Sequence, residues 1–275
     1  GAGIRHYRGE LMKIVHTFYL VIAVIFIYIG VMIGSTFLQY EVKNVDNGIH
    51  LIFGHPYLFV IPQLASLYTI LAWAVALFIF SLVIHATHYE FLYFNQRVAE
   101  LRMISETTTD DELCEKLLAL IKIHNKLIDC VKRLDVMFNR YAFIMIATII
   151  PSTLFALFMI VSRRNDPWPE LLASGPVVLF CIFSFISITS APSKLHNTIY
   201  STKASLCSNM QVWFPYRPNI YHTALAFACH LDQSNLGISI WGFAVLSKPL
   251  VLTTFSVMVT CLALLLQFSD CSVTR

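Results

Sequence analysis

The last apolar stretch of the chain, residues 249–269, carries a polar stripe that could line a water-filled path. Thr253, Ser256, Thr260, Leu264 and Gln267 recur at steps of three and four residues, so on a helix they share one face. The Gln267 amide costs free energy in an apolar helix unless it forms hydrogen bonds or contacts water. The pattern is compatible with ion passage along this face, with Leu264 as an apolar gate, because narrow apolar pores close by dewetting. The alternative is a packed helix whose hydroxyls bond back to the carbonyl four residues earlier.

Other polar residues give no support to enzymatic or metal chemistry. His85 and His88 lie one helical turn apart and precede Glu90, a spacing that can bind a metal, but no second pair completes a ligand set. The sequence has no nucleophile elbow, no paired acid and base, and no glycine-rich phosphate loop. We expect a protein that is not an enzyme and has no cofactor and no metal site.

The composition is that of a polytopic membrane protein. Of its 275 residues, 57% are hydrophobic and 13% charged, and the mean hydropathy is +0.68. A helix needs about 20 predominantly apolar residues to cross a bilayer. Stretches of this length without Asp, Glu, Lys or Arg lie at residues 14–40, 63–89, 141–162, 171–193 and 249–269. We expect five spans in an all-α bundle, and spans free of charge argue against an ion-coupled transporter.

The distribution of basic residues predicts the orientation. With the start of the chain in the cytoplasm, only four of the 19 Lys and Arg residues lie outside, namely Lys43, Arg163, Arg164 and Arg275. Lys and Arg accumulate on the cytoplasmic side of membrane proteins. We therefore expect a plasma-membrane protein with its N-terminal side cytoplasmic and its C-terminus extracellular. The net charge of +3 then reflects orientation and gives no indication of a nucleic-acid partner.

Polar extensions of the helices predict a cytosolic region that holds the bundle together. No residue breaks the helix between Asp110 and Ser162, so we expect one rod there. We expect the apolar stripe of this rod to pack on helices of the same chain. Its residues recur at alternating steps of four and three: Leu113, Leu117, Leu120, His124, Leu127, Val131, Leu134 and Phe138. Two prolines within residues 213–218 should end the extension after the fourth span, and a short helix should follow at residues 220–233.

These features predict six segments along the chain. Residues 1–95 hold the first two spans with their outer loop, and residues 96–140 form a cytosolic helix region. Residues 141–193 hold the next two spans, and residues 194–248 form a cytosolic anchor region. Residues 249–269 are the pore-lining span, and residues 270–275 are an extracellular tail.

Aromatic side chains in the outer halves of the spans are candidates for a small-molecule site. Such pockets are mostly apolar, with a few polar groups that orient the ligand. The candidates are Tyr68, Trp73, Phe155, Phe158, Phe180 and Phe183, with Ser66, Thr69, Ser152 or Thr153 as orienting groups. Aromatic residues in membrane spans are more often packing or lipid contacts, and the sequence leaves that alternative open.

The end of the last span resembles a family signature. Thr260-Cys261, five apolar residues and Gln267-Phe268 are similar to the Thr-Tyr, five apolar residues, Gln-Phe motif that closes the last helix of invertebrate gustatory receptors. Cys261 stands where that family usually has Tyr. Gly242-Phe243, Ser247-Lys248, the long helix into the third span and residues 190–200 add to the resemblance. The chain thus resembles the gustatory receptor superfamily in architecture over most of its length and in motif over its C-terminal region.

The resemblance implies a seven-span receptor, of which this chain holds the third to seventh spans. It implies a homo- or heterotetrameric, ligand-gated, non-selective cation channel in the membrane lipid, with the last helix of each subunit around a central pore. Thr260, Leu264, Gln267 and Phe268 would line or close that pore, and a small-molecule ligand would bind between the earlier spans. Open alternatives are a non-conducting receptor that signals through cytosolic partners, a small-molecule facilitator and a truncated, non-functional product.

Overall fold

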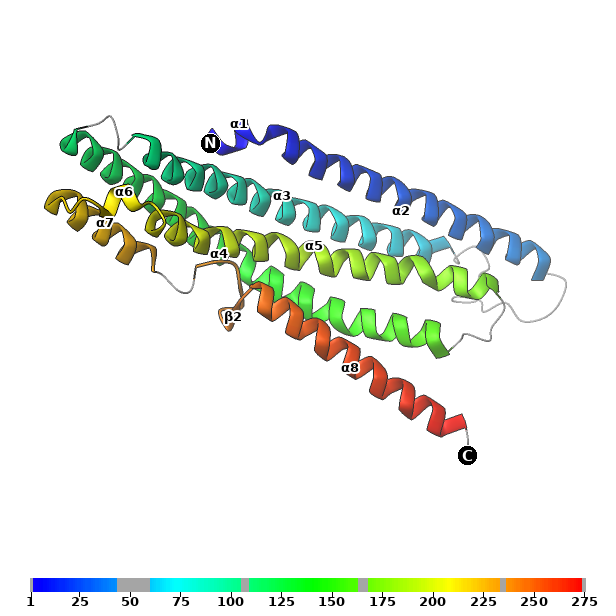
Figure 1. Ribbon diagram of the computed structural model, residues 1–275. Helices are drawn as coiled ribbons and strands as arrows, with labels where there is room; N and C mark the ends of the chain where they lie inside the picture. The colour runs from blue at the N-terminus through cyan, green and yellow to red at the C-terminus, as the bar shows by residue number, and fades with distance from the viewer. Residues whose placement is uncertain (1, 44–59, 105–108, 163–167, 233–235, 274–275) are drawn as a thin grey trace.

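A computed structural model describes residues 2–43, 60–104, 109–162, 168–232 and 236–273. Four long helices run side by side along an elongated molecule: α2 (Arg8–Lys43), α3 (Val60–Ile104), α4 (Asp110–Ser162) and α5 (Trp168–Cys207) (Figure 1). Shorter elements complete it: α1 (Ala2–His6), α6 (Met210–Trp213), α7 (Pro218–Leu231), β1 (Ser239–Ile240) and β2 (Ala244–Val245). The chain closes with α8 (Lys248–Val273).

Helix α4 is the continuous rod that the sequence predicts, from Asp110 to Ser162. At about 1.5 Å per residue it is about 80 Å long. Acidic side chains occupy its first turn, where they complement the positive end of the helix dipole. The predicted stripe is buried within the chain, since Leu113, Leu117 and His124 are at most 1% exposed. This confirms that the heptad pattern serves packing within the chain.

Two apolar cores divide the molecule along its length. The larger core joins α3, α4 and α5 in the middle of the bundle, with Phe80, Ile84 and Ile188 completely buried. The second core lies at the end where α6 and α7 pack, and it includes Leu113, Phe227 and other side chains of α3, α4 and α5. Burying a side chain of this size contributes about 1.5–3 kcal/mol. This end is therefore a packed region in its own right, built from the polar extensions of the long helices.

Among the described residues, three helices are long and apolar enough to cross a membrane: Leu67–Leu101, Asp110–Phe158 and Lys248–Gln267. The other two predicted spans lie within α2 and α5, which are helical over residues 14–40 and 171–193. The bundle of long helices is thus confirmed, while the count of five spans stays a prediction. Helix α3 begins at Val60, earlier than expected, because Pro62 is tolerated in a first helical turn.

One element departs from the all-α prediction. The strands β1 and β2 form a short antiparallel hairpin before α8, with Ser239 paired to Val245. Its turn needs positive φ angles, 48° at Trp241 and 76° at Gly242. The Asp135 carboxylate of α4 accepts hydrogen bonds from the Ser239 backbone N at 2.6 Å and from Ser239 Oγ at 2.8 Å. A distant residue thus fixes the hairpin, which is why the local sequence did not reveal it.

Candidate functional site

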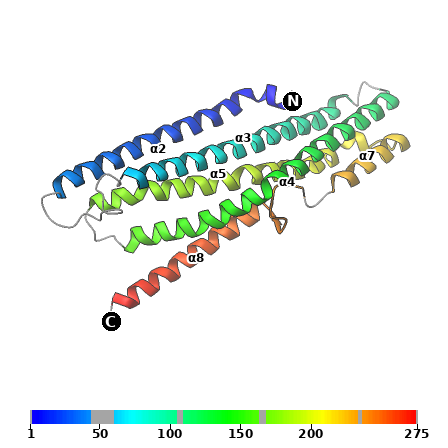
Figure 2. The ribbon, with the colours of Figure 1, turned by 180° about the vertical axis from the view of Figure 1, so that it is seen from behind.

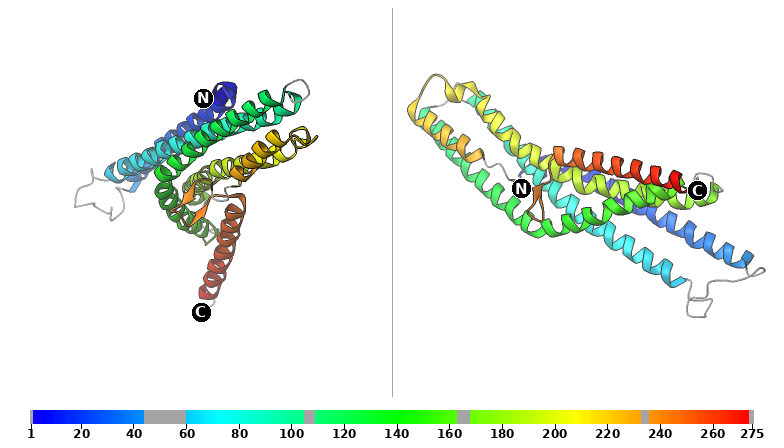
Figure 3. Two further views of the ribbon diagram at one scale, coloured as in Figure 1. Left: turned by 90° about the vertical axis from the view of Figure 1, so that its left-hand side faces the viewer. Right: turned by 90° about the horizontal axis from the view of Figure 1, so that it is seen from below.

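Of the three described helices that are long and apolar enough to cross a membrane, α8 is the least enclosed. It packs against α4 and α5, and its C-terminal end projects away from the other helices (Figures 1 and 2). Seen along the bundle, α8 stands clear of the other long helices (Figure 3). Only 6% of its most apolar stretch is buried, against 28% in α3 and 22% in α4. Most of its surface is therefore left for lipid, water or another subunit.

The predicted polar stripe of α8 lies on this open surface. Thr253, Ser256, Thr260 and Gln267 are exposed, and Leu264 is 49% exposed. By contrast, Met258 is 6% exposed and packs into the main core. The stripe thus lies on one largely exposed face of α8. The side chain of Phe268 lies outside what the structure describes.

The threonine hydroxyl groups of the stripe bond within their own helix. Thr260 Oγ1 donates to the Ser256 carbonyl at 3.0 Å, and Thr253 Oγ1 donates to the Leu250 and Pro249 carbonyls at 2.9 and 3.1 Å. This is the back-bonding that the sequence left open. A hydroxyl oxygen that donates in this way can still accept a hydrogen bond or contact a cation.

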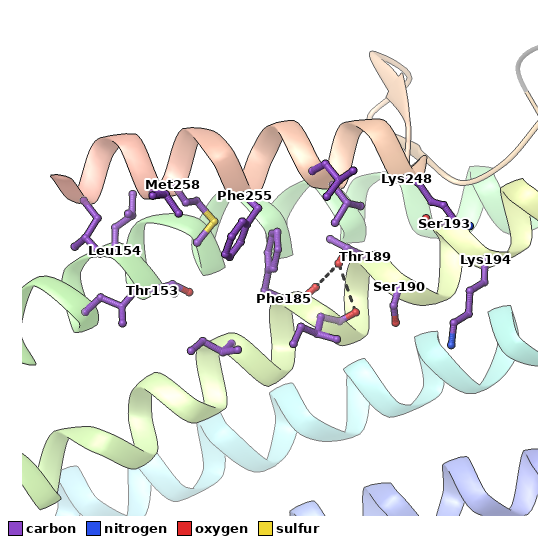
Figure 4. A pocket seen from close by; sticks show the side chains of 17 residues that line it. Thr153, Leu154, Phe185, Thr189, Ser190, Ser193, Lys194, Lys248, Phe255 and Met258 are labelled. Atoms are coloured by element: carbon purple, nitrogen blue, oxygen red, sulfur yellow. Dashed lines mark hydrogen bonds between the residues drawn. The ribbon is translucent and has the colours of Figure 1, made fainter. Parts of the chain in front are cut away.

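A groove of about 730 Å³ lies between α4, α5 and α8. Figure 4 shows Phe185 of α5 and Phe255 of α8 pointing toward each other across it, with Thr153 and Leu154 of α4 at one end. Thr189 Oγ1 donates to the Phe185 carbonyl at 2.7 Å, and Thr153 Oγ1 donates to the Ile149 carbonyl at 2.7 Å. The hydroxyl protons are thereby used within the helices, so the wall of the groove is almost wholly apolar and offers few free donors.

The opposite end of the groove is polar. Ser190, Ser193 and Lys194 of α5 lie there together with Lys248, the first residue of α8. Among the described residues that line the groove there is no Asp or Glu. The sequence analysis did not single out this end. The sequence does contain an indication of this polar end: Lys194 directly follows the uncharged stretch 171–193, and Lys248 directly precedes the uncharged stretch 249–269.

The six aromatic candidates for a ligand site do not converge on this groove. Tyr68 and Phe155 are 75% and 64% exposed. Trp73 and Phe183 pack against the main core, Phe180 packs against a small cluster at Ala74, and Phe158 is half-buried. None of the six lines the groove. A role for them in ligand binding stays a prediction.

The histidine pair at the end of the second predicted span takes part in helix contacts. His88 Nδ1 lies 3.0 Å from Thr198 Oγ1 of α5, and His85 Nδ1 lies 2.8 Å from the Ser81 carbonyl. Within the part of the chain that the structure describes, no group of three or more His, Cys, Asp or Glu residues could hold a metal. His88 therefore joins α3 to α5, while the contact of His85 stays within α3.

The comparisons with known proteins agree with this architecture. A family model described as 7tm chemosensory receptor matches residues 4–270, from α1 into α8. No curated protein matches the chain. The match confirms the resemblance read from residues 260–268, and it confirms that the protein is not an enzyme. The chain is a multi-pass membrane protein of the gustatory type and belongs to the 7tm chemosensory receptor family.

Proposed function

We propose that this receptor is a subunit of a ligand-gated, non-selective cation channel whose pore is lined by α8. The observation that carries the proposal is the exposed stripe of Thr253, Ser256, Thr260, Leu264 and Gln267 on a helix that its own chain barely covers. A polar face in an otherwise apolar membrane helix is stable where it borders water. Four copies around an axis, as the family resemblance implies, would put these stripes in one aqueous path.

In this pore each side chain has a distinct task. A ring of Leu264 closes the path when the helices are close, since a narrow apolar constriction expels water. Gln267 and Phe268 lie beyond it, and the Gln267 carbonyl oxygen replaces part of the hydration shell of a passing cation. Thr260 supplies a further oxygen on the opposite side of Leu264. Splaying of the α8 helices turns Leu264 from the axis and opens the path.

Ligand binding would act by shifting an existing equilibrium between closed and open bundles. A small molecule opens the pore to the extent that it binds the open arrangement more tightly than the closed one. The cytosolic segments 96–140 and 194–248 would hold the homo- or heterotetramer together while the spans rearrange. The N-terminal side would be cytoplasmic and the C-terminus extracellular at the plasma membrane, as the positive charges predict.

Currents through purified protein in planar bilayers test this proposal. Leu264→Ala should raise the resting leak because the apolar constriction widens, and Gln267→Ala should change conductance or ion selectivity. Leu265 is the matched control, since it is also exposed (40%) but lies one residue off the stripe. If Leu264→Ala and Leu265→Ala behave alike, α8 does not line a pore. If no variant and no wild-type sample conducts, the non-conducting receptor becomes the better interpretation.

A further inference from the structure

We propose that the groove between α4, α5 and α8 binds an anionic phospholipid. Its acyl chain lies along Phe185, Phe255 and Met258, and its phosphate lies at Lys194 and Lys248. The inference does not depend on ion conduction. It rests on the apolar wall, the charged end and the length of the groove.

The wall of the groove is suited to a hydrocarbon chain. Large apolar side chains on its rim remain open to the surroundings: Ile186 is 55%, Leu252 69% and Phe255 58% exposed. The hydroxyls of Thr153 and Thr189 already donate to carbonyls of their own helices. A polar ligand would therefore find few partners along this wall, whereas an acyl chain would fill it without leaving polar groups unsatisfied.

The charged end of the groove is suited to a phosphate group. Lys194 and Lys248 are both exposed, and neither forms an ion pair with any residue that the structure describes. Among the described residues that line the groove there is no Asp or Glu, so the charged groups at this end are both positive. Basic residues at the edge of a membrane span attract anionic headgroups in this way.

The length of the groove matches one leaflet of a bilayer. Lys194 directly follows the uncharged stretch 171–193, and Lys248 directly precedes the uncharged stretch 249–269, so both mark the membrane boundary. From Lys248 to Leu262, the last groove residue of α8, the helix rises about 21 Å. One leaflet has a hydrocarbon depth of about 15 Å, half of the bilayer core. The remainder accommodates the headgroup region, which puts the phosphate beside the lysines.

Lipid retention by the purified full chain tests the proposal. The protein is placed in nanodiscs of equal parts phosphatidylglycerol and phosphatidylcholine, released, and its bound lipids are identified by native mass spectrometry. The wild type should retain phosphatidylglycerol in preference. Lys194→Gln with Lys248→Gln should lower that preference roughly tenfold or more, because two headgroup contacts are lost. Lys194→Arg with Lys248→Arg should keep it.

Matched variants separate the groove from general effects of charge and folding. Lys122→Gln with Lys126→Gln removes the same charge from α4 and should leave the preference unchanged. Ile186→Trp should displace the lipid while keeping both lysines, since it fills the apolar channel. Elution volume and melting temperature show whether each variant remains folded. If the double Gln variant does not fold, the double Arg variant still tests the site, because it keeps both positive charges.

Three outcomes would overturn the proposal. Equal retention of the two lipids by the wild type would show that the lysines do not select charge. Full displacement by inorganic phosphate would indicate a site for free phosphate with no part for the acyl chain. If Ile186→Trp retained as much lipid as the wild type but changed the number of subunits in the assembly, a second copy of the chain would cover the groove.

Discussion

Thr202 of α5 donates a hydrogen bond of 2.6 Å to Oδ1 of Asn95 on α3, and both side chains are buried. The Asn95 Nδ2 group donates to the Thr198 carbonyl and to Ser201 Oγ, each at 2.9 Å. One amide thus satisfies donors and acceptors on two turns of α5. This contact lies where the two apolar cores meet, so it fixes the register of α3 against α5.

Replacing Asn95 with Ala should therefore destabilise the protein by about 2–3 kcal/mol, since buried partners on α5 lose their hydrogen bonds. The melting temperature of the detergent-solubilised protein measures this loss. Gln96 is exposed and adjacent, so Gln96→Ala should change little. Equal effects at the two positions would contradict a specific role for Asn95.

A second prediction concerns the close approach of α1 to α3. Gly3 is buried, and a Cβ atom there would lie 2.6 Å from the Tyr89 carbonyl oxygen and 2.8 Å from Glu90 Cα. Because these are backbone atoms, the clash cannot be relieved by a rotamer change. Gly3→Ala should displace α1 and break the hydrogen bonds from Gly3 N and Ile4 N to the Glu90 carboxylate. We expect a loss of about 1–3 kcal/mol.

Gly9 provides the control for this prediction, because a Cβ atom there would meet nothing within 4 Å. Both glycines are helical, so Ala improves helix propensity equally at the two positions. Gly9→Ala should be neutral or stabilising, while Gly3→Ala should speed hydrogen exchange at residues 3–7. Slow exchange at these amides in Gly3→Ala would show that α1 adapts without leaving α3.

The sequence predicted those elements whose pattern is local. Helix α4 follows from a long apolar period without a breaker, and its inward-facing stripe, buried or partly buried from Leu113 to Phe138, follows from the same period. The break before α7 follows from two prolines. The exposed face of α8 also follows, because its polar residues recur at helical steps.

Features that need two distant segments could not be predicted. Phe185 and Phe255 line the same groove only because α5 and α8 pack together. When a helix is apolar on all sides, its sequence does not indicate which face packs against its neighbours. The six aromatic candidates lie outside this groove for the same reason, since composition places them in spans but does not orient them. The hairpin at Ser239 depends on Asp135, which lies 104 residues earlier.

The contact between Asp135 and Ser239 should control how firmly the hairpin is held. Asp135→Ala removes both hydrogen bonds to Ser239, and we expect the hairpin to open more often, by about tenfold for a local loss of about 1.4 kcal/mol. Trp241 and Phe243 at its tip are 55% and 83% exposed, so chymotrypsin cleavage there reports the opening. Asp129→Ala, an exposed carboxylate on the same helix, should leave the cleavage rate unchanged. An unchanged rate in Asp135→Ala would mean that the hairpin is held by other contacts.

The second core should weaken as the pH falls. His124 is 1% exposed, with its ring 5.6 Å from Phe94 and 5.9 Å from Phe227. Burial, and then the nearby His230, lower the pKa of His124 from 6.5 to about 4. The unfolded chain therefore takes up the proton first, and stability should fall between about pH 6.5 and pH 4 by about 2–3 kcal/mol. Below that range this effect levels off, because both states are protonated.

The variant His124→Leu should flatten this part of the pH dependence. His124 Nδ1 is buried without a hydrogen-bond partner, so Leu removes an unsatisfied polar atom and should be tolerated at neutral pH. Melting temperatures of the solubilised protein between pH 7.5 and pH 4.5 measure the difference from the wild type. His222→Leu, at an exposed position on α7, is the control and should keep the wild-type slope. If His124→Leu kept that slope as well, the acid sensitivity would belong to other groups and His124 would be protonated at little cost in the folded chain.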